Sequence, residues 1–381
     1  MSLEKISYAE YKDTPKHWEI ADATFSKINL VVGKNSSGKS RLLSVINSFS
    51  KLITGQHLPY ENCSFSARIN INNKIYEYEI NFLNKSVSHE LLKIDSVEKI
   101  RRNNDGAGSI WYEKERQYLD FKLPADALAA VNRRDEIQHP YLMDLNQWAS
   151  SVALYHFGSD FGRTRVLGIQ EAEIAFRSPN TPLFDDPDNL VQVYSSAFLK
   201  YGEDFDKAII TDMGKLGYEL TDVGSEDLRT ITNYFPAAAI GIFTVEKDLG
   251  FKVPQMHLSQ GMFRALALTI HLNLCTFSNN KKLILVDDIG EGLDYDRAVR
   301  TINLLIEKAK KGELQLIMTS NDRFVMNEVP LEYWSILERS SGKVNIYNSE
   351  NSKDIFENFK YVGLNNFDFF ASRFFKPEGK K

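Results

Sequence analysis

One short run constrains this 381-residue chain more than any other: Gly33-Lys34-Asn35-Ser36-Ser37-Gly38-Lys39-Ser40. It has the spacing G-x-x-x-x-G-K-S, in which the glycines let successive backbone N–H groups turn toward a polyphosphate. In such a loop the lysine, here Lys39, reaches the outer phosphates, and the hydroxyl of Ser40 can bind Mg²⁺. The run therefore predicts a site for the phosphates of a nucleotide.

The residues on either side of this phosphate loop have the periodicities that it requires. The loop is preceded by a short apolar run typical of a buried strand: Ile28, Leu30, Val31 and Val32. It is followed by apolar residues at helical spacing: Leu42, Val45, Ile46, Phe49 and Ile53. The sequence thus predicts strand, loop and helix in that order, with the positive end of the helix dipole directed at the anion.

A second strand offers carboxylates for the metal side of such a site. Residues 283–286 are all apolar, as expected for a buried parallel strand, and Asp287 and Asp288 follow at its carboxyl end. We expect Asp287 to face Mg²⁺ and Asp288 to orient or deprotonate an attacking water. A strand that merely ends in two solvated aspartates is the alternative, which the phosphate loop upstream disfavours.

The segment Leu258-Ser259-Gln260-Gly261 precedes a predicted helix, and Ser259 can cap that helix. The interval from Ser259 to Asp287 leaves room for one helix and a turn. A serine cap alone is common and indicates no function. Its place in the chain, between the phosphate loop and the aspartate strand, makes this segment a specific signal for a functional motif.

Together these motifs resemble the ABC-type ATPase head, in the branch shared by SMC, RecF-like and OLD-family proteins. The resemblance covers roughly residues 1–90 and 250–340. The matching motifs are Walker A (33–40), the signature (258–261), Walker B (Asp287-Asp288), the D-loop (Gly292-Leu293-Asp294) and the switch (Thr319-Ser320-Asn321-Asp322).

The resemblance implies an α/β fold, a P-loop ATPase head with a β-rich amino-terminal layer and an inserted, mostly helical lobe. The head would comprise residues 1–90 and 250–381, and the inserted lobe residues 91–249. Alternating apolar residues predict hairpins at 65–82 and 334–347. Because no heptad repeat is sustained in the insertion, the long coiled-coil arms of SMC proteins are not expected.

The resemblance also implies ATP and Mg²⁺ as ligands and assigns residues to them. Catalysis would involve Lys39, Asp288 and Asn321, and the metal would be held by Ser40 and Asp287. The expected nucleotide contacts are Gly33, Asn35, Ser36, Ser37, Gly38, Lys39, Ser40, Arg41, Ser259, Gly261 and Asp294.

Two residues depart from the family pattern at the hydrolysis step. The family usually has Glu after the Walker B aspartate and His in the switch, where this chain has Asp288 and Asn321. Aspartate is one methylene shorter than glutamate, and asparagine cannot take up a proton as histidine can. We therefore expect slow hydrolysis, with Glu291 as an alternative carboxylate for the water.

In that family each nucleotide lies between the Walker motifs of one protomer and the signature serine of another. A homodimer or higher homo-oligomer with shared sites is then the simplest arrangement. We expect an ATP-dependent switch that controls a separate effector, a nuclease or a toxin, as in AAA-type ABC ATPases of bacterial antiphage defence. Two alternatives stay open: a DNA-binding ATPase of repair or chromosome maintenance, and a scaffold that binds ATP without hydrolysing it.

Composition and charge narrow the classes of protein to which this chain can belong. The net charge of −5 argues against a broad electrostatic grip on nucleic acid, although a local contact with DNA is compatible with it. No apolar stretch approaches the roughly 18 residues that span a membrane, and the first residues lack a signal-peptide core. Cys63 and Cys275 stand alone, without the spacing of a zinc site. These features predict a cytoplasmic protein.

Three further expectations concern aromatic and amide side chains. Trp18 or Tyr11 is a candidate for stacking on adenine, although a core position is favoured. Gln147 is the candidate for the family's Q-loop glutamine. The five phenylalanines within 367–375 are expected to pack a terminal helix on its own domain rather than to dock a partner.

Overall fold

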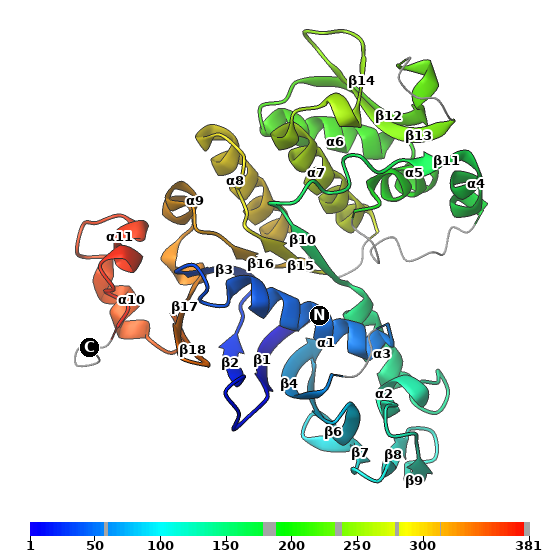
Figure 1. Cartoon of the computed structure of the whole chain (residues 1–381), viewed down its shortest axis with the longest axis vertical. Helices are drawn as coiled ribbons and strands as arrows, with labels where there is room; N and C mark the ends of the chain where they lie inside the picture. The colour runs from blue at the N-terminus through cyan, green and yellow to red at the C-terminus, as the bar shows by residue number, and fades with distance from the viewer. Residues whose placement is uncertain (57–59, 178–187, 233–237, 279–281, 313, 377–381) are drawn as a thin grey trace.

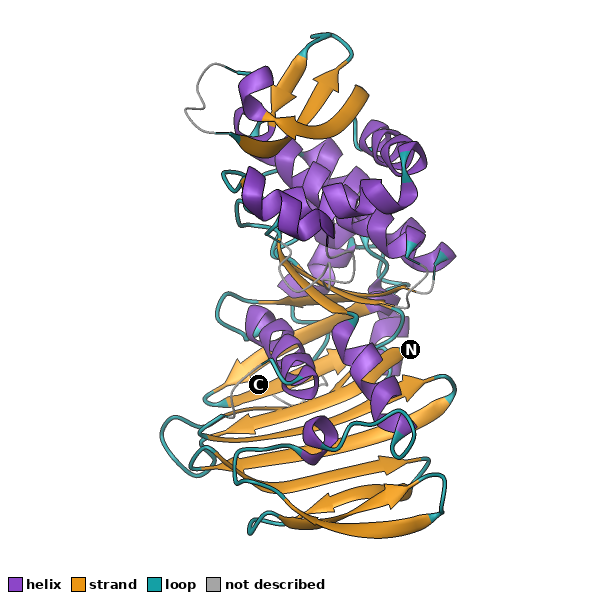
Figure 2. Ribbon diagram, turned by 90° about the vertical axis from the view of Figure 1, so that its right-hand side faces the viewer, coloured by secondary structure: helices purple, strands orange, loops and turns teal. Residues whose placement is uncertain are grey.

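The computed structural model describes residues 1–56, 60–177, 188–232, 238–278, 282–312 and 314–376. Within these residues, a 14-stranded mixed sheet forms the larger part of the molecule, and a small sheet with several helices forms a second lobe above it (Figures 1 and 2). The described residues include no helix with both the length and the apolar character needed to cross a membrane.

Parallel strands form one end of the large sheet. In order across it they are β10 (Val152–His156), β15 (Lys282–Asp287), β16 (Leu314–Thr319), β3 (Ile28–Gly33) and β17 (Trp334–Ser340). Every residue of β3, β15 and β16 is buried, as in a sheet covered on both faces. The strands predicted before the phosphate loop and before Asp287 are confirmed. Because parallel strands end at one edge, the predicted site residues after β3, β15 and β16 emerge together.

The rest of the sheet is antiparallel, apart from the parallel contact of β18 with β2, and carries both predicted hairpins. It continues through β18 (Lys343–Asn348), β2 (Trp18–Thr24), β1 (Ser2–Glu10), β4 (Asn62–Ile71), β5 (Lys74–Leu83), β6 (Ser86–Ile94), β7 (Val97–Arg102), β8 (Ala107–Tyr112) and β9 (Gln117–Lys122). The turn of the β4–β5 hairpin is formed by Asn72 and Asn73, whose φ angles of 52° and 64° suit the right-handed twist of the strands. The β17–β18 pair confirms the second hairpin.

The segment 91–249 is less helical than expected. Its first third carries β7 to β9 and so extends the amino-terminal layer, and β10 joins the parallel strands. The strand β7 escaped prediction because Arg102 lies on its buried side, where the guanidinium donates to the carbonyls of Val87, Pro124 and Ala125. A fully buried arginine breaks the alternation that marks a strand. The division of the chain at residues 90 and 250 stays a prediction.

Helices cover both faces of the parallel strands. One face carries α1 (Lys39–Thr54), and α2 (Ala129–Asn132) and α3 (Pro140–Ser150) pack beside α1 toward the antiparallel strands β7 and β4. The other face carries α7 (Gln260–Phe277), α8 (Tyr295–Lys311), α9 (Arg323–Glu328), α10 (Lys353–Phe359) and α11 (Asn366–Ala371). The terminal phenylalanines confirm the expected packing, since Phe369 is fully buried against Phe356 and Phe359.

The second lobe combines the short antiparallel strands with three helices. They are β11 (Leu167–Gly168), β12 (Leu220–Asp227), β13 (Ala239–Glu246), β14 (Lys252–Pro254), α4 (Ile169–Arg177), α5 (Leu190–Tyr201) and α6 (Glu203–Lys215). Short 3-10 turns occur at Leu228–Thr230, Gln255–His257 and, in the head, Leu331–Tyr333.

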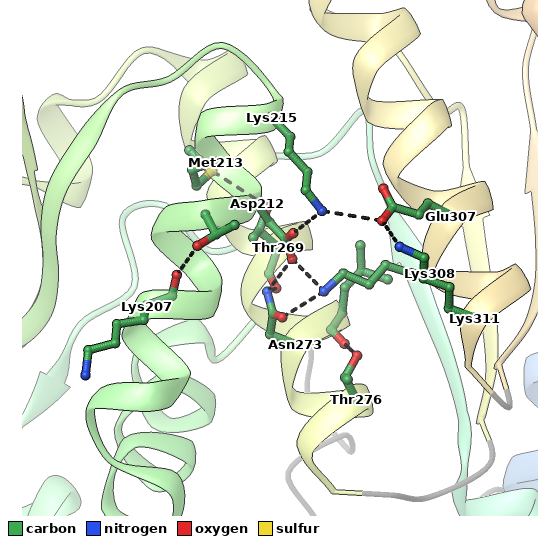
Figure 3. Close-up of polar contacts among 12 residues, drawn as sticks. Lys207, Asp212, Met213, Lys215, Thr269, Asn273, Thr276, Glu307, Lys308 and Lys311 are labelled. Carbon is green, nitrogen blue, oxygen red and sulfur yellow. Dashed lines mark hydrogen bonds and ion pairs between the residues drawn. The ribbon is translucent and has the colours of Figure 1, made fainter.

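A polar cluster ties α6 of this lobe to α7 and α8 (Figure 3). The buried carboxylate of Asp212 lies 2.6 Å from Lys308 Nζ and 3.2 Å from Lys215 Nζ. Asn273 Nδ2 donates to the same carboxylate at 2.9 Å, and its Oδ1 accepts from Lys308 at 2.9 Å. Because a buried charge that loses its partner is costly, this cluster fixes the lobe on the two helices that follow the signature and the D-loop.

The carboxyl of Asp206 on α6 gives a pH-dependent prediction for stability. Burial raises its pKa to about 6, and the charges of Asp222 and Glu203 act in the same direction. When the pKa of a carboxyl is higher in the folded than in the unfolded protein, the free energy of unfolding falls as the pH rises toward and through the folded pKa. Asp206→Asn, which can still accept from Tyr194, should therefore raise the free energy of unfolding by about 1–2 kcal/mol at pH 7.5 and little at pH 4.

Denaturant unfolding of the wild type and this variant at both pH values measures the difference. Asp204→Asn, on the same helix but exposed, is the matched control and should change stability at neither pH. An equal gain for Asp206→Asn at pH 4 and pH 7.5 would show that its ionisation is not responsible.

Candidate functional site

The phosphate loop joins β3 to α1 through backbone angles that glycine accommodates. Gly38, the residue before α1, has φ 106°, and a Cβ there would lie 3.2 Å from Trp18 Cζ2. A Cβ at Gly33 would lie 2.4 Å from Ser37 Oγ. The first turn of α1 has neither an acidic residue nor a side-chain cap, so its N–H groups stay available to an anion. Strand, loop and helix are confirmed as predicted.

Lys39 lies inside the turn of this loop. Its ammonium donates to the carbonyl oxygens of Gly33 at 3.0 Å and Lys34 at 3.4 Å, and the side chain is only 6% exposed. Burial lowers the pKa of Lys39, and the carboxylates of Asp288 and Asp287 oppose that shift. A desolvated cation among backbone donors is the environment in which a phosphate is bound strongly.

Asp287 ends β15 as a buried carboxylate with several donors. Thr319 Oγ1 donates to its Oδ1 at 2.6 Å, and His156 Nδ1 lies 3.5 Å from its Oδ2. Burial raises the pKa of Asp287, but hydrogen bonds from His156, Thr319 and Ser40 together hold it below its usual value. An ionised carboxylate beside the Ser40 hydroxyl is a donor set that suits Mg²⁺, so the residues present fit the metal that this fold implies.

Asp288 has a left-handed backbone, with φ 54°. Its N–H donates to Thr319 Oγ1 at 2.8 Å, which ties the backbone to the end of β16. Burial and the neighbouring charges of Asp287 and Glu291 raise the pKa of this half-buried carboxyl. Aspartate tolerates this left-handed conformation better than most residues other than glycine. The Glu291 carboxylate lies against Gly158, where a Cβ would be 2.2 Å from its Oε2.

His156 belongs to the site although no sequence pattern pointed to it. It is the last residue of β10 and pairs in register with Asp287. Gln147, the candidate for the Q-loop glutamine, lies on α3, which leads into the amino end of β10. The site is at the carboxyl end of that strand, so the structure does not bring Gln147 to it.

The switch residue Asn321 contacts the phosphate loop directly. Its Nδ2 donates to Asn35 Oδ1 at 3.0 Å. Ser320 Oγ donates to the carbonyl of Ile289 at 3.2 Å, and Asp322 caps α9 by accepting from Phe324 N and Val325 N. The switch thus lies between the phosphate loop and the Walker B segment, as its place in the chain predicted.

The signature and the D-loop form a separate cluster. Ser259 caps α7 as predicted, with its hydroxyl accepting from Met262 N at 3.2 Å. A Cβ at Gly261 would lie 3.2 Å from the carbonyl oxygen of Gly292 in the D-loop. Asp294 caps α8 and pairs with Arg297. In the described part of the chain, the contacts given for Ser259, Gly261 and Asp294 are thus with residues of the signature, the D-loop and the helices that follow them. None of these contacts is with the phosphate loop.

Arg264 holds this second cluster to the strand beside Walker B. Its guanidinium is almost fully buried and donates to the carbonyls of Gly158, Ser159 and Glu291, the last two at 2.8 Å. It lies one turn into α7, so a shift of the signature helix would disturb both the loop after β10 and the D-loop. No motif in the sequence indicated this residue.

Trp18 and Arg41 pack against each other beside the phosphate loop. Trp18 is 2% exposed, which confirms the favoured core position, and the Arg41 guanidinium lies 4.1 Å from its ring centroid. Arg41 also pairs with Glu10, and Tyr11 donates to Glu61. The indole face is thus covered by Arg41.

Comparisons with known proteins agree with a phosphate loop and an aspartate strand on a P-loop fold. The family described as "AAA domain, putative AbiEii toxin, Type IV TA system" matches residues 28–327. An SMC head bound to the C-winged helix domain of ScpA is 12% identical, with a TM-score of 0.57 over 93% of this chain and 100% of that one. The Pyrococcus furiosus Smc head with an extended coiled coil, bound to the C-terminal domain of ScpA, is 14% identical, with a TM-score of 0.50 over 94% and 99%. No curated protein matches the sequence. At these identities the likeness to solved structures establishes the fold, an SMC-like P-loop ATPase head.

Proposed function

Because this chain belongs to the AbiEii-type AAA domain family, an ATPase family, we propose that it binds ATP between two copies of itself and that the resulting dimer controls a separate effector. The observation that carries the proposal is the convergence of Lys39, Ser40 and Asp287 at one edge of the sheet. These groups supply a cation for the outer phosphates and oxygen ligands for Mg²⁺.

We infer the following roles for the site residues. Lys39 would hold the outer phosphates, Ser40 and Asp287 would hold Mg²⁺, and Asp288 would orient the attacking water. Bound Mg²⁺ would neutralise charge that develops on the phosphates. The methylene missing from Asp288 and the amide of Asn321 both favour low turnover, since neither matches the Glu and His of related heads.

A second copy of the chain would complete the site. Ser259 and Asp294 contact residues of their own cluster, so their predicted role at the nucleotide requires the loop of another protomer. One chain carries one of each motif, and a two-fold dimer therefore contains two shared sites. Closure would couple ATP occupancy to the arrangement of the two heads.

The family description names a toxin–antitoxin system, which supports a toxin as the effector. A nuclease effector and a role in antiphage defence are proposed from the resemblance to ATPases of such systems. A cytoplasmic location accords with such a role. Co-purification of the tagged chain with the products of neighbouring genes, with and without Mg·ATP, identifies the effector.

Phosphate release from Mg·ATP, followed per protomer across a wide range of protein concentrations, tests the shared site. The specific rate should rise with concentration and then saturate as dimers form. A rate independent of concentration would contradict a site completed by a second copy. Background release together with measurable ATP binding would instead identify a scaffold held by the nucleotide.

A further inference from the structure

Two aromatic side chains are exposed where the D-loop and the switch lead into their helices. Tyr295, which is 50% exposed, is the first residue of α8 and follows Asp294 of the D-loop. Phe324, which is 41% exposed, lies in the first turn of α9, two residues after Asp322 of the switch. The two ring centroids are 5.0 Å apart and the ring planes meet at 68°, an edge-to-face contact. One aromatic pair thus connects the D-loop with the switch at the surface.

Neither ring of this pair belongs to the hydrophobic core. Both helices are anchored there by other apolar residues, all of them buried: Ala298, Ile302, Leu305, Val325 and Met326. Single exposed apolar residues are common on protein surfaces, but two rings in contact form a continuous apolar surface. Aromatic residues of this kind are enriched at the centre of protein–protein interfaces. The pair therefore indicates a surface that another molecule covers.

The charged residues around the pair carry both signs. Asp296 lies in the first turn of α8, Arg323 begins α9, and both are exposed. Beside them, Asp294 and Arg297 pair with each other at 2.7 Å. A two-fold interface brings the same patch of two copies together, so that a carboxylate of one copy can face a cation of the other. A patch with a single sign of charge would repel itself in that arrangement, so the mixture of signs favours a second copy of this chain as the partner.

The place of the pair in the chain gives a second reason for this partner. Ser259 and Asp294 contact residues of their own cluster, so their proposed role at the nucleotide requires another protomer. Tyr295 directly follows Asp294, and a D-loop that approaches a second copy brings this ring with it. We propose that Tyr295 and Phe324 form an apolar contact between two copies of this chain, beside the shared nucleotide sites. The inference rests on the proposed dimer. Because the pair connects the D-loop with the switch, a copy that docks on it fixes both segments at once.

Sedimentation equilibrium with Mg²⁺ and a non-hydrolysable ATP analogue measures the dissociation constant of the dimer. Tyr295→Ala and Phe324→Ala should each raise this constant roughly tenfold or more, because a two-fold interface loses the ring twice. The matched control is Tyr361→Ala, which removes a 90% exposed tyrosine from the turn between α10 and α11. It should leave the dissociation constant unchanged.

Binding of the analogue at protein concentrations far below the dimer dissociation constant separates a contact between copies from a contact with the nucleotide. There Tyr295→Ala and Phe324→Ala should bind the analogue as the wild type does, which also shows that they are folded. A loss of affinity in this dilute protein, or an unchanged dimer constant in both variants, would overturn the proposed contact while the wild type still dimerises. A wild type that stays monomeric with the analogue would instead refute the proposed dimer, and the contact with it.

Discussion

Replacing Lys39 by alanine is expected to weaken Mg·ATP binding at least a hundredfold, about 2.7 kcal/mol, while the protein stays folded. The ammonium is the one side-chain cation inside the described turn of the loop, and its contacts there are the carbonyls of Gly33 and Lys34. Without it, Mg²⁺ alone would offset the repulsion between the outer phosphates and the carboxylates of Asp287 and Asp288.

Stability should respond differently from binding. Burial lowers the pKa of Lys39, which means that folding takes its cation out of water at a cost. Removing that cation should leave the unfolding temperature unchanged or raise it. Titration calorimetry with Mg·ATP and thermal unfolding measure the two effects separately.

The matched control for this variant is Lys51→Ala, in the last turn of the same helix α1 and far along it from the loop. It should bind Mg·ATP as the wild type does. Wild-type affinity in Lys39→Ala would mean that the nucleotide binds elsewhere, and a large loss of stability would mean that the binding result reports misfolding.

The parts of the site that could be predicted from sequence are those fixed by neighbours in the chain. Gly38 needs a left-handed backbone because of the turn it makes, Ser259 caps the helix that it precedes, and Asp287 ends an apolar strand. In each case the residue type and its immediate surroundings suffice. That is why the strand, loop and helix of the phosphate site and both hairpins were predicted correctly.

The parts that could not be predicted depend on partners distant in sequence. His156 reaches Asp287 only because β10 pairs with β15 in one register. The acceptors of Arg264 are main-chain carbonyls, which every residue has, so no residue type marks them. The strands β7 to β9 were missed partly because the buried Arg102 reads as a surface residue. Tyr295 meets Phe324 only because α8 packs against α9.

Asp288→Asn is expected to keep ATP binding and to lose phosphate release by a factor of about 10² or more. Asparagine tolerates the left-handed backbone at this position, whereas alanine would add strain, so the substitution tests the carboxylate alone. It also removes one of two adjacent negative charges from the phosphate site, which should tighten ATP binding.

Light scattering after size-exclusion chromatography measures the second consequence of this change. Since the proposed dimer opens on hydrolysis, Asp288→Asn should stay dimeric in Mg·ATP where the wild type returns to monomer. Asp287→Asn, one residue away, should instead lose Mg²⁺ and fail to dimerise.

Wild-type turnover in Asp288→Asn would transfer the role of orienting the water to Glu291. A loss of ATP binding equal to that of Lys39→Ala would refute the division of roles between Lys39 and Asp288. An ATP-filled dimer that accumulates while phosphate release is lost would assign Asp288 to the hydrolysis step, because the substitution then removes turnover and leaves binding intact.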